Sequence, residues 1–142
     1  MPTIVLRASV VWLVIIGVET AHGILRAALL VPVIGDFPAR QVGVFTGSAL
    51  ILGVAVLFIR WVRAGTNRRL LAVGLLWAVL TVLFEIGLGR RVLGLPWDRL
   101  LEDYDLTRGG VLGLGLLFMA VTPLLAARLR RETRPPKPKP KP

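Results

Sequence analysis

The feature that most constrains this sequence is a stretch without any charged residue, from Val42 to Ile59, bounded by Arg40 and Arg60. A helix needs about 20 predominantly apolar residues to cross the hydrocarbon core of a bilayer. The chain of 142 residues is 55% hydrophobic and 18% charged, whereas soluble domains hold about 25% charged residues. The stretch therefore predicts a membrane-spanning helix, and the composition predicts an integral membrane protein.

Three further apolar segments reach a similar length. The N-terminal one contains Glu19, His22 and Arg26, the next contains Glu85, and the last ends before Arg128. The expected spans are about 9–34, 41–60, 69–89 and 109–128. Short connections force neighbouring helices to be antiparallel. Residues 1–130 are thus predicted to form an all-α integral membrane four-helix bundle.

A cleaved leader is an alternative for the N-terminus, because Arg7 precedes an apolar stretch from Ala8 to Val18. Apolar sequence resumes at Ile24 and continues through Leu30. We therefore expect a span interrupted by polar residues and not a leader.

The distribution of basic residues predicts that both termini lie in the cytoplasm, since Lys and Arg near span ends are retained there. With that orientation 12 basic residues flank the inner side and five the outer side. The net charge of +10 then lies beside the membrane, so no nucleic-acid partner is expected. Anionic lipids are the expected contacts of Arg60, Arg63, Arg68, Arg69 and the basic segment 128–141. The predominance of Arg favours a bacterial cytoplasmic membrane.

Two connecting regions and the tail have distinct patterns. Gly35 to Pro38 predicts a tight outer turn. Between the third and fourth spans, Trp97, Leu100 and Tyr104 share one helix face, which predicts a short amphipathic interfacial helix over about 96–105. The segment 131–142, rich in Pro and Lys, predicts a disordered cytoplasmic tail.

The polar residues of the first span share one face, because Glu19, His22 and Arg26 are spaced i, i+3 and i+7. A charge within the bilayer costs about 2.5 to 3.5 kcal/mol, so such residues normally pair inside the protein. Glu85 lies at the same depth on the third span, on the face that also carries Gly74, Trp77 and Thr81. We expect Arg26 to bridge Glu85 and Glu19, with His22 hydrogen-bonded among them.

A rim of polar residues is expected above this network at the outer surface. Its members are Arg40, Gln41, Arg90, Arg91, Asp98, Asp103, Tyr104 and Arg108. The network is interpreted in three ways: a structural lock between helices, a site for a ligand, ion or proton, or a docking surface for another subunit.

Metal and enzyme chemistry are both disfavoured. Glu19 and His22 have the Glu-x-x-His spacing of di-iron bundles, but a second such motif is missing and Arg26 opposes a cation. The chain has no Cys, which excludes thiolate sites, and its spans offer no complete catalytic constellation. We therefore expect no metal, no cofactor and no enzymatic activity.

The glycines of the second span, Gly43 and Gly47, are four residues apart and predict close packing of helices. For function, the first expectation is an accessory or interaction subunit that meets a membrane protein partner or a second copy of itself. The alternative is a small-molecule or proton-linked transport or sensing protein with an outward-facing polar pocket. A membrane-embedded enzyme ranks below both.

Overall fold

The computed structural model describes residues 2–132 and 138–141, and no strand occurs in this described part. Four helical stretches are long and apolar enough to cross a membrane: Pro2–Ile34, Asp36–Val62, Asn67–Val92 and Leu112–Arg131. The expected all-helical class and the expected number of span-length helices are confirmed. The chain has the character of a multi-pass membrane protein.

The elements follow one another with few residues between them. In chain order they are α1 (Pro2–Leu25), the π-helical η1 (Arg26–Leu30), α2 (Val31–Ile34), α3 (Asp36–Val62), α4 (Asn67–Gly87), the π-helical η2 (Leu88–Val92), α5 (Trp97–Glu102), the 3₁₀ turn η3 (Leu106–Arg108) and α6 (Leu112–Glu132). Of the expected tail, residues 133–137 and 142 lie outside the described residues.

The helices extend past several limits expected from hydropathy. α1 begins at Pro2, and α3 begins at Asp36, so that Gly35 alone separates α2 from α3. Gly35 has a φ of 88°, in the region that favours glycine. Hydropathy marks only the apolar part of a helix, whereas its polar ends remain helical in the headgroup region.

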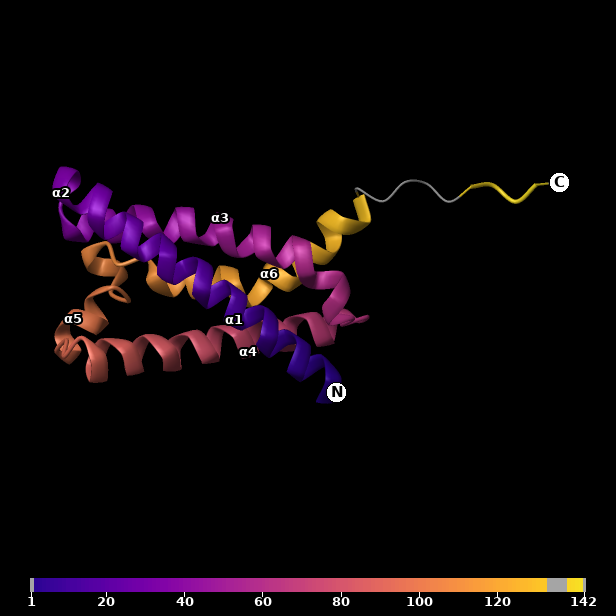
Figure 1. Ribbon diagram of the computed structural model, residues 1–142, viewed down its shortest axis with the longest axis horizontal. Coiled ribbons are helices and arrows are strands. Elements are labelled where there is room, and N and C mark those ends of the chain that lie inside the picture. Colours follow the sequence, from indigo (N-terminus) through magenta and orange to yellow (C-terminus); the bar gives the residue numbers. More distant parts are fainter. Residues whose placement is uncertain (1, 133–137, 142) are drawn as a thin grey trace.

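The four long helices pack side by side (Figure 1). α6 contacts both α3 and α4, while α1 runs obliquely across the others and contacts α3 and α4. The start of α1, the turn between α3 and α4 and the end of α6 lie at one end, here called the termini end. α2 and α5 lie at the opposite end, called the loop end.

The apolar core fills the half of the molecule near the termini end. Trp77 is fully buried there and its indole donates to the Ala8 carbonyl at 2.8 Å. Trp12 donates to the Thr81 hydroxyl at 3.0 Å. These two hydrogen bonds join α1 to the face of α4 on which the sequence places Trp77 and Thr81.

Gly74 on the same helix faces α6 instead. A Cβ at this position would lie 1.8 Å from the Ala120 carbonyl oxygen, so the α4 and α6 backbones approach each other too closely for any side chain. Both partners of this contact are backbone.

Two π-helical segments, η1 and η2, interrupt the spans near the loop end. A π-helical turn accommodates one extra residue and rotates the following side chains relative to an α-helix. Neither segment has a signal in the hydropathy pattern. η1 begins at Arg26, the residue expected at the centre of the polar network.

Candidate functional site

A cavity of about 250 Å³ opens at the loop end, between the start of α3, the end of α4 and the segment 97–112. Apolar residues make up much of its wall, among them Phe37, Leu100 and Val111. Its polar lining consists of Arg26, Arg40, Gln41, Glu85, Arg99, Asp103 and Tyr104.

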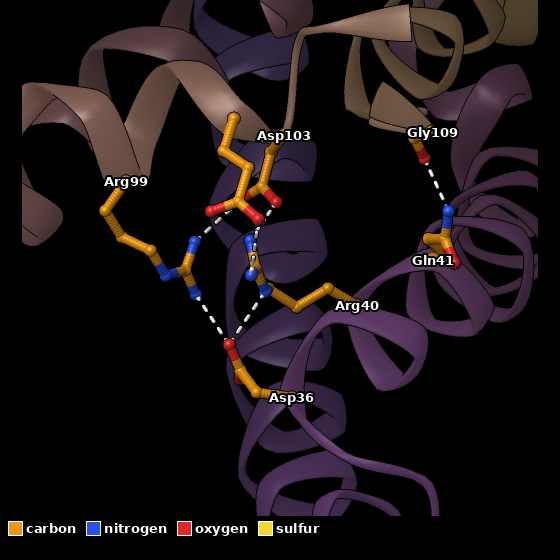
Figure 2. Close-up of polar contacts among 7 residues, drawn as sticks. Asp36, Arg40, Gln41, Arg99, Asp103 and Gly109 are labelled. Atoms are coloured by element: carbon orange, nitrogen blue, oxygen red, sulfur yellow. Dashed lines mark hydrogen bonds and ion pairs between the residues drawn. The ribbon is translucent and has the colours of Figure 1, made fainter. Parts of the chain in front are cut away.

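Arg40 is the centre of an ion-paired cap over this cavity (Figure 2). Its side chain is only 10% exposed, and its Nε lies 3.0 Å from Asp36 Oδ2. It also pairs with Asp103 and, at 3.8 Å, with Glu102. Arg99 lies 3.3 Å from Asp36 and from Asp103. The cap thus ties the first turn of α3 to the end of α5.

A second contact fastens the same loop to α3. The side-chain amide of Gln41 donates to the Gly109 carbonyl at 2.6 Å, as Figure 2 shows. Gly109 has a φ of 84°, and a Cβ there would lie 2.7 Å from the Gln41 amide nitrogen. Glycine is therefore required at this position by both conformation and space.

Tyr104 connects the cap to α4. Its hydroxyl donates to Glu85 Oε2 at 3.4 Å. Burial raises the pKa of the Tyr104 phenol above its usual value, and the nearby Glu85 carboxylate raises it further. The phenol is therefore neutral at ordinary pH and acts as a hydrogen-bond donor toward Glu85.

The polar stripe of α1 lies on the small residues of α3. His22 Nδ1 lies 3.7 Å from Glu19 Oε2, and His22 Nε2 is 2.7 Å from the Thr46 hydroxyl. A Cβ at Gly47 would be 2.7 Å from Glu19 Oε2. Gly47 therefore makes room for a carboxylate, and not for the backbone of a neighbouring helix.

Arg26 occupies the corresponding space over Gly43, where a Cβ would lie 2.9 Å from Arg26 Cδ and 3.0 Å from Nη1. The expected direct bridge is not formed: among the described residues, Arg26 makes no ion pair with Glu19 or Glu85, although its charge attracts both carboxylates. The Nε of Arg26 and the Oε1 of Glu19 are buried without a hydrogen-bond partner in this part of the chain.

The oblique path of α1 explains the missing bridge (Figure 1). Counting residues along each span places Arg26 and Glu85 at the same depth in the membrane. Such a count contains no information about the lateral position of a helix. α1 touches α4 through Ala8 and Trp12, while Glu19 of α1 lies against Gly47 of α3 and Arg26 of η1 lies against Gly43. Arg26 and Glu85 consequently line one cavity without touching each other.

The expected rim is only half correct in position. Arg40, Gln41, Asp103 and Tyr104 line the cavity, whereas Arg90, Arg91, Asp98 and Arg108 are exposed and lie outside its wall. Arg90 donates to the Leu95 carbonyl at 2.9 Å and stacks on Trp97 at 5.0 Å. Arg108 pairs with Asp105 at 3.5 Å. Arg90 and Arg108 therefore stabilise the loop itself.

Three residues of the cap are absent from the expected site: Asp36, Arg99 and Glu102. A signal for two of them exists in the sequence, because Asp36 and Arg40, and likewise Arg99 and Asp103, are opposite charges at i, i+4 spacing. The residues Gly35 to Pro38 predict a turn, but Asp36 belongs to the first turn of α3.

The charges around the cavity fall into two groups. Arg40 and Arg99 are compensated by acidic residues of the cap. Arg26 and Glu85 have no direct charged partner among the described side chains and line the same space. A molecule in this cavity would meet a guanidinium on one side and a carboxylate on another.

No protein-family model, curated protein or solved structure matches this chain. Its function is therefore proposed from the geometry of the site.

Proposed function

We propose that this protein is a multi-pass four-helix bundle of a bacterial cytoplasmic membrane that binds a small polar molecule in its outer cavity, for transport or sensing. Both termini lie in the cytoplasm in this proposal. The excess of basic residues near the termini end supports that orientation. The loop end, with the cavity and α5, then faces the outside, and α5 lies at the membrane interface.

The observation that supports the proposal is that Arg26 and Glu85, opposite charges without a direct ion pair among the described residues, line one cavity. A charge at membrane depth costs roughly 2.5 to 3.5 kcal/mol on insertion scales, and the Tyr104 hydrogen bond to Glu85 offsets only part of that cost. A ligand with an anionic oxygen group for Arg26 and a donor or cationic group for Glu85 would offset that cost. The cap needs no such ligand, because its charges compensate one another.

The size of the cavity limits the ligand. Pockets for drug-sized molecules measure about 300 to 1,000 Å³, and this cavity measures about 250 Å³. A molecule about the size of an amino acid fits this volume. Its apolar part would contact Phe37, Leu100 and Val111, which belong to the cavity wall.

Native mass spectrometry of the protein, extracted gently from its own membranes, tests this function. We expect a small molecule bound to the wild type and to Arg91→Ala, which changes an exposed arginine outside the cavity. We expect it to be absent from Arg26→Ala and Glu85→Gln. A wild type that is empty in every preparation, or a molecule retained equally by all variants, would contradict the proposal.

A second candidate function, an accessory subunit, is favoured by one observation. The hydrogen bond between His22 and Thr46 lies at the exposed surface of α1 and α3. A polar pair at such a depth suits a polar group of another membrane helix. In the same experiment, a partner chain lost on Thr46→Val would support this function, and a lone chain would contradict it.

A further inference from the structure

A second hollow, of about 340 Å³, lies at the termini end and is independent of the outer cavity. It is an open hollow bordered by the end of α3, the turn that follows, the start of α4 and the end of α6. Four arginines line it: Arg60, Arg63, Arg130 and Arg131. Its remaining wall is apolar, with Ile59 and Leu70 belonging to the buried core. No carboxylate among the described side chains lines it.

We propose that this hollow binds the phosphate of one anionic phospholipid, such as a phosphatidylglycerol. Guanidinium groups hold phosphate oxygens through paired, charge-assisted hydrogen bonds. The apolar wall suits the glycerol and the first carbons of the acyl chains. A hollow with cationic and apolar parts thus matches the two parts of a lipid, whereas free phosphate would use only the first.

The position of the hollow supports a lipid over a soluble ligand. Arg60 lies in the last turn of α3, and Arg131 lies in the last turn of α6, where both helices leave their apolar segments. Phospholipid headgroups occupy this level of a membrane. In the proposed orientation the hollow faces the cytoplasmic leaflet, which carries anionic lipids.

The backbone conformation at Arg63 is strained for a residue with a Cβ. Arg63 has a φ of 58°, the one positive φ at a non-glycine residue in the described chain. Glycine is the usual residue directly after a helix in this conformation, because a Cβ is strained there. This turn places Arg63 at the same hollow as Arg60. The side chains of Arg60 and Arg63 therefore line one hollow.

The test uses the full chain in detergent, titrated with short-chain phosphatidylglycerol or with phosphatidylcholine of the same acyl length and followed by native mass spectrometry. The variant Arg60→Gln/Arg63→Gln removes two lining arginines. The matched control Arg68→Gln/Arg69→Gln removes two exposed arginines of the same region that do not line the hollow. Both variants lose the same charge.

We expect the wild type to bind one phosphatidylglycerol in preference to phosphatidylcholine. At about fivefold in affinity for each arginine, Arg60→Gln/Arg63→Gln should weaken that binding roughly 25-fold. Arg68→Gln/Arg69→Gln should stay within about twofold of the wild type in detergent, because these side chains lie outside the hollow and attract the lipid only through screened long-range charge. Equal weakening in both variants would overturn the proposal in favour of diffuse attraction. Inorganic phosphate that displaced the lipid at equal concentration would overturn the lipid assignment.

A single variant separates lipid binding from folding. Arg63→Gly removes the guanidinium and also removes the strain at the positive φ. We expect its thermal midpoint to equal or exceed that of the wild type, while its affinity for phosphatidylglycerol falls about fivefold. A misfolded variant could not give this combination. Unchanged lipid affinity in Arg63→Gly would contradict the role assigned to Arg63.

Discussion

The same long helices form both halves of this molecule, but apolar packing holds one half together and ion pairs hold the other. Toward the termini end, α1, α4 and α6 meet through Trp77, Met119 and other buried side chains, with two indole hydrogen bonds between α1 and α4. Toward the loop end, buried charges surround a cavity under an ion-paired cap. The first half is a packed apolar core. The second half surrounds a cavity in which Arg26 and Glu85 have no direct ion pair, the place where the proposed ligand would bind.

Glycine illustrates the difference between the halves. Gly74 lets two backbones touch, since its Cβ position overlaps the Ala120 carbonyl. Gly43 makes room for Arg26, and Gly47 makes room for Glu19. The same small residue therefore supports close helix packing in one half and holds charged side chains in the other. Alanine substitutions should separate these roles.

The largest effect is expected at Gly74. Gly74→Ala forces α4 away from α6, because the overlapping atoms belong to the backbone and cannot rotate aside. Overpacking of this kind costs about 3 kcal/mol. Unfolding by a denaturing detergent, followed by tryptophan fluorescence, measures the loss. Gly53→Ala is the matched control, since Gly53 lies within α3 and nothing lies within 4 Å of its Cβ position.

Gly53→Ala should be neutral or stabilise the protein by up to about 1 kcal/mol through helix propensity. Similar losses in the two variants would mean that the close contact between α4 and α6 is not specific to Gly74. In that case the half near the termini end would not be more tightly packed than the half near the loop end.

The next effect is expected at the cap. Arg40→Ala leaves Asp36 and Asp103 without their buried cation and should cost about 2 kcal/mol, less than a fully buried pair because Asp36 is 58% exposed. Hydrogen exchange should increase in α5 and the start of α3, and not around Trp77. Arg91→Ala, at an exposed arginine of the same end, is the control. Exchange that increases equally in both halves would show that they do not respond separately.

These two regions also differ in how far the sequence predicts them. The four spans follow from apolar length alone. Of the face shared by Gly74, Trp77 and Thr81, the last two contact α1, whereas Gly74 packs against α6. The prediction of a direct bridge between Arg26 and Glu85 is not met, because the depth of a residue along its helix does not define the direction in which that helix crosses its neighbours. The π-helical segments η1 and η2, which contain Arg26 and Arg90, have no pattern in hydropathy that predicts them.

A smaller loss of stability is expected at Gly43, with a larger loss of ligand. Gly43→Ala displaces Arg26, whose side chain can rotate at a cost of about 1 kcal/mol. The same displacement removes the guanidinium from the proposed site. Native mass spectrometry should therefore find less bound molecule in Gly43→Ala, although its stability stays near that of the wild type. Full retention of the molecule would place its binding elsewhere.

The smallest effect concerns the proton of Tyr104, and it tests whether the cap excludes water. The chain has one tyrosine, so absorbance at 295 nm during a titration with base reports this residue alone. Burial is the main cause of the raised pKa, and Glu85 is the next. The midpoint should lie above the ordinary value of about 10. Glu85→Gln should lower that midpoint without restoring the ordinary value.

The same proton makes stability depend on pH in one direction. The folded state holds the phenolic proton of Tyr104 more tightly than the unfolded state. The stability that this proton contributes is therefore fully present below the unfolded pKa of about 10 and is lost as pH rises from there through the higher folded pKa. Tyr104→Phe should lack this decline. A wild-type midpoint near 10 would mean that water reaches the phenol, and the loop half would then be an open surface and not a capped cavity.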